Sequence, residues 1–291
     1  ESKEGKTIGL SYFKERGFSE ETIKKFQLGY SPKQKDALSK LAINSSYKLK
    51  YLQDSGLSIV KNDTALDRFR ERMMFPVHSF SGRVLGFGGR TLQKDNKAKY
   101  VNSPESLIYL KSKILYGIYF AKQEISKLNN CYIVEGYTDV ISLHQAGVQN
   151  VVSSSGTSLT TEQIKLINRF TKNITILFDG DAAGLKASFR SIDMILSEGM
   201  NVRVVLFPDG EDPDSFAKNS TQEELMQYLQ KKQQDFITFK TNVLSKDGEN
   251  DPAKRVEMIK DIASSIAQIP DAISKSEYIK VCSRMLKVKE V

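Results

Sequence analysis

Acidic residues follow three strongly apolar segments of the chain, and their positions suit the binding of a divalent metal ion. They are Glu135 after 131–134, Asp179 and Asp181 after 174–178, and Asp212 and Asp214 beyond 202–207. In open α/β sheets ligands bind outside the carboxyl ends of the strands, where acids from separate strands converge. Carboxylates crowded together repel one another, and Mg2+ or Mn2+, which prefer oxygen ligands, relieve that repulsion.

The local sequence around these acids also admits plainer interpretations. Glu135 is followed by a glycine and then by Asp139, which could simply stabilise the first turn of a helix. Asp179 and Asp181 flank a glycine, as acids do in an ordinary turn, and Asp212 and Asp214 flank a proline that restricts their directions. We favour a shared metal site because three strand ends carry acids in succession.

The apolar pattern predicts elements that position these acids. Strands at 131–135, 150–153, 174–178 and 202–207 alternate with helices at about 138–146, 160–170 and 182–198. Alternation of this kind indicates a parallel sheet with helices on its faces. The region before it is expected to be α+β, with short helices over 7–26, strands joined by glycine turns over 68–101 and a helix within 107–128. Residues 86–89 are read as one of these turns.

After residue 215 the pattern is helical throughout, with segments near 221–243, 252–268 and 272–287 that suit a small bundle. The predicted domains are therefore a basic α+β subdomain at 1–127, an α/β subdomain at 128–215 and a helical subdomain at 216–291. Their charges differ: 24 lysines and arginines against 13 acids (+11), 6 against 11 (−5), and 13 against 11 (+2). A basic region beside an acidic one suits a polyanion and a metal ion as ligands.

The composition argues against several classes of protein. No apolar stretch is long enough to cross a bilayer, and the first residues do not form a secretory signal, so we expect a cytoplasmic protein without a membrane partner. Cys131 and Cys282 have no partners at metal-ligand spacing, which argues against zinc and favours buried free thiols. His78 and His144 are expected to be structural. No phosphate-binding loop of the GxxxxGK[ST] type occurs, which disfavours a fused helicase.

Three motifs together resemble the TOPRIM domain found in primases, topoisomerases, some nucleases and recombination mediators. They are Glu-Gly-Tyr-Thr-Asp at 135–139, Asp-Gly-Asp-Ala-Ala-Gly at 179–184 and Gly-Glu-Asp-Pro-Asp at 210–214. The flanking segments 68–77, 82–90, 99–105 and 111–117 narrow the resemblance to bacterial DnaG-type primases. This family synthesises short RNA primers on single-stranded DNA from ribonucleoside triphosphates, leaving an RNA–DNA hybrid, and is a DNA-directed RNA polymerase, that is, a nucleotidyltransferase.

The resemblance also implies roles for individual residues. Glu135, Asp179 and Asp181 would bind the catalytic Mg2+ or Mn2+, more than one ion included, with Asp139, Asp212 and Asp214 as supporting acids. Template and nucleotide contacts would fall to Arg16, Arg68, Arg70, Arg90, Lys99, Tyr100, Asn102, Lys111 and Lys113, with Arg68, Arg70 and Arg72 either joining this surface or only bracing it. Arginine and lysine suit such contacts because they pair with phosphate oxygens.

Two departures from a full-length primase are expected. The zinc-binding module that precedes the family's core is missing, and the chain is expected to stop before the region that contacts the replicative helicase, as an excised catalytic core of a bacterial protein acting at replication forks would. Two other functions stay open at this stage. One is a TOPRIM nuclease or topoisomerase fragment, which would cleave DNA without nucleotides. The other is a recombination-mediator-like module that binds DNA without metal or turnover.

Overall fold

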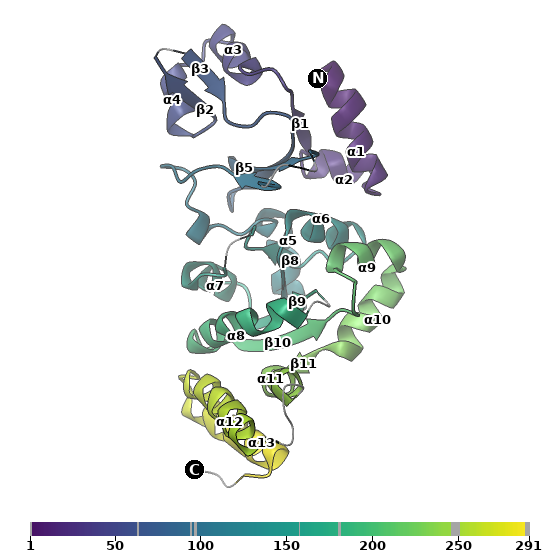
Figure 1. The fold of residues 1–291 in the computed structure, drawn as a ribbon, viewed down its shortest axis with the longest axis vertical. Coiled ribbons are helices and arrows are strands. Elements are labelled where there is room, and N and C mark those ends of the chain that lie inside the picture. Colours follow the sequence, from purple (N-terminus) through teal and green to yellow (C-terminus); the bar gives the residue numbers. More distant parts are fainter. Residues whose placement is uncertain are drawn as a thin grey trace. The chain divides into compact units, whose positions relative to one another are not determined.

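The computed structural model describes residues 2–62, 64–93, 95, 98–156, 158–179, 182–245 and 251–288, without the side chains of 182–188. The chain divides into two compact units, Glu1–Tyr119 and Phe120–Val291 (Figure 1). Among the described residues, no helix is long and apolar enough to span a membrane.

The first unit combines short helices with an antiparallel sheet of order β1-β4-β5-β6. Its elements are the π-helix η1 (Gly5–Leu10), α1 (Ser11–Glu15), α2 (Glu20–Lys25), β1 (Gly29–Ser31), α3 (Ala37–Asn44), α4 (Leu49–Asp54), β2 (Ser58–Lys61), β3 (Thr64–Asp67), β4 (Arg72–His78), β5 (Val84–Thr91), β6 (Tyr100–Asn102) and the 3-10 turn η2 (Lys111–Lys113). Helix α5 (Ile118–Leu128) begins at the last residues of the first unit, and the rest of it belongs to the second. The α+β character predicted for this region is confirmed.

Local sequence explains the helix starts in this unit. Ser19 precedes α2, and its hydroxyl accepts a hydrogen bond from the backbone N–H of Thr22, which satisfies one of the free donors of a helix amino terminus. Two acids follow in the first turn and two lysines in the last, an order that complements the helix dipole.

The sequence predicted a turn at the glycines of 86–89, and this prediction is wrong, because they lie within strand β5. A Cβ atom on Gly89 would lie 2.7 Å from the ring of Phe69, and one on Gly86 would lie 3.0 Å from Tyr109. Glycine occurs here because aromatic side chains pack directly over the strand's backbone. The turn between β4 and β5 is at Gly82, whose φ of +90° favours glycine.

The second unit is built on a five-stranded sheet of order β11-β10-β9-β7-β8. Its elements are β7 (Cys131–Val134), α6 (Tyr137–Gln145), β8 (Val151–Ser153), α7 (Thr161–Asn168), β9 (Asn173–Phe178), α8 (Ala182–Ser197), β10 (Asn201–Leu206), α9 (Pro213–Asn219), α10 (Gln222–Lys232), β11 (Gln234–Asp235), α11 (Phe236–Ser245), α12 (Pro252–Ala267) and α13 (Ala272–Leu286). The four strands β7 to β10 are parallel, as predicted, and β11 is antiparallel to β10.

One detail of the helical region differs from the prediction. The segment expected as one helix over 221–243 is two helices, α10 and α11, separated by the short strand β11. Asp235 causes the break, because its carboxylate accepts hydrogen bonds from the backbone N–H groups of Ile237 and Thr238 and so begins a new helix. The helices α12 and α13 that follow lie side by side (Figure 1).

The cysteines are buried, as the sequence predicted, and both histidines are buried as well. Cys131 and Cys282 are free thiols in the interior, and burial raises the pKa of both. His78 is 5 % exposed, and its Nε2 lies 3.2 Å from the side-chain oxygen of Gln27.

Candidate functional site

The strand order of the second unit places two of the predicted acids at a topological switch point. From β7 the chain crosses through α6 to β8 on one side, whereas from β9 it crosses through α8 to β10 on the other. The crevice at the carboxyl ends of β7 and β9 is therefore the expected ligand site of this sheet. Glu135 follows β7 directly and Asp179 follows β9 directly, so the two acids flank that crevice.

Asp139 lies in the first turn of α6 and is 9 % exposed. Its Oδ2 accepts a hydrogen bond from the backbone N–H of Gly136 at 2.8 Å. Burial raises the pKa of its carboxyl to about 7, with further increases from the nearby charges of Asp179, Asp212 and Asp214, although the Gly136 hydrogen bond lowers it. Acids that follow β9 and β10 therefore act electrostatically on a buried carboxyl group that follows β7.

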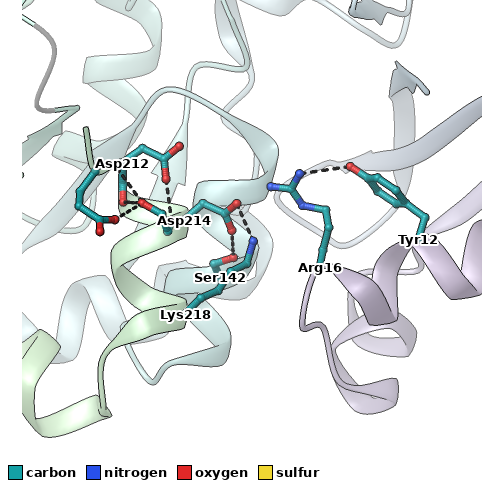
Figure 2. A network of polar contacts seen from close by, with 8 residues as sticks. Tyr12, Arg16, Ser142, Asp212, Asp214 and Lys218 are labelled. Atoms are coloured by element: carbon teal, nitrogen blue, oxygen red, sulfur yellow. Dashed lines mark hydrogen bonds and ion pairs between the residues drawn. The ribbon is translucent and has the colours of Figure 1, made fainter. Parts of the chain in front are cut away.

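Asp212 and Asp214 lie at the start of α9, which packs beside α6 (Figure 1). Asp212 caps α9, and its Oδ1 accepts a hydrogen bond from the backbone N–H of Ser215 at 2.6 Å. Asp214 is 5 % exposed; its Oδ1 accepts a hydrogen bond from the Ser142 hydroxyl and its Oδ2 pairs with the Lys218 ammonium at 2.7 Å (Figure 2). Asp214 thus joins α6 to α9.

Asp181, the remaining predicted acid, lies outside the described residues. Within the described part of the chain, no group of three or more histidine, cysteine, aspartate or glutamate side chains is arranged to hold a metal ion. The side chain of Glu135 is exposed, and its carbonyl oxygen accepts a hydrogen bond from the Ser153 hydroxyl at 2.6 Å. The metal assignment of these residues therefore stays a prediction.

In the first unit, three of the predicted contact residues share one face of the sheet. Arg90 lies opposite Tyr100 on β6, and Gly88 lies opposite Asn102. Because side chains alternate along a strand, Arg90, Tyr100 and Asn102 project from the same side. The Arg90 guanidinium carbon is 5.3 Å from the ring centroid of Tyr12 and 5.9 Å from that of Tyr100, which are cation–π distances.

Tyr12 also contacts Arg16, another predicted residue. The Arg16 Nη1 donates a hydrogen bond to the Tyr12 hydroxyl at 3.4 Å (Figure 2). Two Arg90 nitrogens, Nε and Nη1, are buried and have no hydrogen-bond acceptor among the described residues. Arg16, Arg90, Tyr12 and Tyr100 form what we call the tyrosine–arginine cluster. The sequence reasoning missed Tyr12, although its position four residues before Arg16 on a helix is a usable signal.

The other predicted basic residues divide into braces and exposed charges. Arg68 Nε donates to the carbonyl oxygen of Gly56 at 2.6 Å. Arg72 Nη1 donates to the carbonyl oxygens of Gly89 and Ala98, and burial lowers the pKa of Arg72. These two arginines hold backbone segments together. By contrast, the side chains of Arg70, Lys99 and Lys113 are exposed, and Lys111 is half-buried.

Three protein-family models match successive parts of the chain. Residues 1–122 match "DNA primase catalytic core, N-terminal domain" and residues 132–217 match "Toprim-like". Residues 237–290 match "DnaB-helicase binding domain of primase". The third match corrects one expectation, because a segment similar to a helicase-binding domain lies within the chain rather than being absent from it.

Individual relatives extend the similarity over nearly the whole chain. A DNA primase of Halalkalibacterium halodurans is 38% identical over 283 residues, 96% of this chain and 47% of its own length. A DNA primase of Clostridium acetobutylicum is 38% identical over 285 residues, 96% of this chain and 46% of its own length. The chain thus spans about half the length of these curated relatives.

Solved structures show the same similarity in three dimensions. The crystal structure of a DNA primase domain from Pseudomonas aeruginosa superimposes with a TM-score of 0.89 and 31% identity, covering 100% of this chain and 92% of that one. The structure of a DnaG primase catalytic domain bound to ssDNA gives a TM-score of 0.85 and 34% identity, covering 97% of this chain and 89% of that one.

Proposed function

Because the chain belongs to the family of DnaG-type DNA primase catalytic cores, we propose that it synthesises short RNA primers on single-stranded DNA for replication. The reaction is a nucleotidyl transfer that consumes ribonucleoside triphosphates and yields an RNA–DNA hybrid. The observation that carries the proposal is the placement of Asp139, Asp179, Asp212 and Asp214 after three strands of one parallel sheet, near enough for the other three to act on the buried carboxyl of Asp139. Their position is the ligand-binding edge of such a sheet.

The residues present suit Mg2+ or Mn2+. All the candidate ligands are carboxylates, which these hard cations prefer. A cation would offset the charges of Asp179, Asp212 and Asp214, which add to the larger effect of burial in raising the pKa of Asp139. In this proposal Glu135, Asp179 and Asp181 hold the ion, and Asp139, Asp212 and Asp214 support them. Such an ion, when bound there, would supply Lewis-acid polarisation of the α-phosphate and would activate the primer 3′-hydroxyl.

The first unit binds the template and the incoming nucleotide in this scheme. Arg90 presents buried N–H donors that have no acceptor in the part of the chain that the structure describes, and a phosphate oxygen is the kind of acceptor that such donors take. Tyr100 is 38 % exposed and offers a ring for base stacking. The exposed charges of Arg70, Lys99 and Lys113 attract the nucleic-acid backbone in a salt-dependent manner.

The three predicted domains divide this work. Residues 1–127 bind template and nucleotide, 128–215 hold the metal ion, and 216–291 form the helical part. Since 237–290 resemble a helicase-binding domain, we include contact with a replicative helicase among the functions of the last helices. The relatives are DNA primases of bacteria, and we place the activity at replication forks in the cytoplasm.

Primer synthesis tests the proposal directly. The assay supplies single-stranded DNA, four ribonucleotides and Mg2+ or Mn2+, and compares the wild type with Glu135→Gln and Asp179→Asn. Both substitutions keep the side chain's shape and remove its charge, so we expect primer yield to fall at least about 100-fold, as for loss of a transition-state interaction.

The matched control is Glu162→Gln, since Glu162 is an exposed acid of the same unit that pairs with Lys165 on the surface of α7. It should retain full yield. Unchanged yield in both site variants would remove the metal assignment. Cleavage of end-labelled DNA without nucleotides would instead support a nuclease.

A further inference from the structure

Asp214 is engaged on both carboxylate oxygens by groups of the protein itself. The Ser142 hydroxyl donates to Oδ1, and the Lys218 ammonium lies 2.7 Å from Oδ2. The exposed fractions of the Asp214 and Lys218 side chains are 8% and 30%. The acid is therefore buried with a cationic partner, whereas that partner reaches solvent.

This pairing lies within the acidic cluster proposed to bind metal. Asp214 is one of the three aspartates whose charges raise the pKa of Asp139. A cation beside Asp214 reduces the repulsion in this cluster, because an opposite charge at short range favours the ionised carboxylate. A divalent ion held by these acids would reduce the same repulsion, so the ammonium and the ion would act on one set of carboxylates.

The position and chemistry of Lys218 would allow its ammonium to separate from the Asp214 carboxylate. Lys218 lies four residues after Asp214 on α9, so both side chains leave the same face of one helix. Its ammonium sits on a flexible four-carbon stem and is strongly hydrated when free. Rotation of that stem would move the charge into water, and the hydrogen bond from Ser142 would still hold the carboxylate.

We propose that Lys218 is an internal counter-ion that neutralises Asp214 in the metal-free protein and competes with a divalent ion for this carboxylate. The inference rests on the proposed metal site and adds to it a residue that sets how tightly the site binds metal. Lys218 is a positioning residue in this proposal, because it acts through Asp214.

Direct metal binding tests the inference without any activity measurement. Free Mn2+ is quantified by electron paramagnetic resonance while the wild type and Lys218→Met are titrated. Loss of one nearby positive charge should tighten Mn2+ binding by about threefold to tenfold, the order expected for a partly screened interaction between charges. Lys218→Gln, which is neutral but keeps a hydrogen-bond donor, should shift binding in the same direction.

A double substitution separates competition at Asp214 from a general effect of charge. In an Asp214→Asn background, Lys218→Met should change Mn2+ affinity by less than about twofold, because two residues in contact are not additive. An equally large change in that background would overturn the inference. So would weaker or unchanged Mn2+ binding by both single variants.

Lys165→Met is the matched control, since Lys165 is an exposed lysine of the same unit paired with Glu162. Its Mn2+ affinity should equal that of the wild type. A second readout guards against misfolding: Mn2+ should raise the melting temperature of Lys218→Met more than that of the wild type. Failure of the counter-ion role leaves the loss of primer yield in Glu135→Gln untouched, so the two proposals fail separately.

Discussion

The carboxylate of Asp139 and the backbone N–H of Gly136 are joined by a hydrogen bond of 2.8 Å. This bond ties the first turn of α6 to the turn that follows Glu135, so the buried acid has a fixed position at the end of β7. The same acid has a pKa raised to about 7, chiefly by burial. Ligand binding at this edge of the sheet should therefore change the protonation of Asp139.

The raised pKa predicts a pH dependence of stability in the absence of metal. The folded protein keeps a proton on Asp139 that the unfolded chain releases near 3.8, so this contribution to stability is complete at low pH and is lost as pH rises through about 7. Asp139→Asn lacks this titration. Between pH 5 and 8, in EDTA, we expect the variant to gain about 2–3 kcal/mol in free energy of unfolding relative to the wild type, measured by urea titration.

A bound metal ion should reduce this loss of stability with rising pH, because a cation stabilises the ionised carboxylate. Adding Mg2+ at pH 7 should release protons from the wild type and fewer from Asp139→Asn, as measured by calorimetry in buffers of different ionisation enthalpy. Parallel pH profiles of stability for the two proteins in EDTA would contradict the raised pKa.

Gly136→Ala should reduce primer synthesis with little effect on stability. A Cβ atom on Gly136 would lie 3.0 Å from Asp139 Oδ2, so the carboxylate must move by a few tenths of an ångström. The backbone of Gly136, with φ −115° and ψ 169°, suits alanine. Small misplacements of a catalytic group are costly, and we expect a loss of about tenfold in primer yield.

The control for this substitution is Gly29→Ala, where a new Cβ would meet no atom within 4 Å. Both variants should melt within a few degrees of the wild type. Equal primer yields for the two variants would show that the Gly136 contact does not matter to the site.

Arg90→Lys tests the tyrosine–arginine cluster. Lysine keeps the charge but loses the planar guanidinium that lies beside the rings of Tyr12 and Tyr100. We expect binding of single-stranded DNA to weaken by about threefold to tenfold with an unchanged salt dependence. Arg90→Met should weaken it further and reduce the salt slope by about one.

Fluorescence anisotropy with a labelled oligonucleotide at several salt concentrations gives both quantities. Arg83→Lys is the control, because Arg83 is exposed in the turn between β4 and β5. If Arg90→Lys binds as tightly as Arg83→Lys, the guanidinium plane has no role in binding.

The parallel sheet could be predicted because its strands are buried apolar runs that alternate with helices of ordinary length. The segment 32–67 gave no such pattern. Its short elements depend on Asp67, whose carboxylate accepts hydrogen bonds from the backbone N–H groups of Leu38 and Ser39 almost thirty residues earlier. A contact of that separation leaves no local signal.

The candidate site shows the same division. Acids at strand ends could be identified from their positions alone, and the resemblance to DnaG-type primases that they supported is confirmed. The contact between Ser142 and Asp214 could not be predicted, because it joins residues that are 72 positions apart in the sequence and forms only when α6 packs on α9. Lys218 was overlooked for a different reason: a lysine four residues after an acid is common on helix surfaces.

Lys240 is the centre of a buried polar network that joins three helices of the second unit. Its side chain is fully buried, and its ammonium donates to Ser265 Oγ at 2.6 Å, Asp261 Oδ2 at 3.0 Å and Asp193 Oδ1 at 3.4 Å. The ammonium also lies 4.5 Å from the ring centroid of Phe189. These contacts connect α11 to α12 and to α8, the helix between β9 and β10. Lys240 therefore holds the helices that follow the sheet against one of the helices that cover it.

Replacing Lys240 should separate the value of the charge from that of packing. Lys240→Met keeps most of the volume, and Asp193 and Asp261, at 35% and 44% exposed, can be hydrated, so we expect a loss of about 1–2 kcal/mol. Lys240→Ala adds a cavity and should cost about 3 kcal/mol or more. Urea unfolding and amide hydrogen exchange over α11 and α12 measure both effects. Lys231→Met, at an exposed position on α10, should stay within about 0.5 kcal/mol of the wild type, and a Lys240→Met variant as stable as this control would show that the buried network adds nothing to stability.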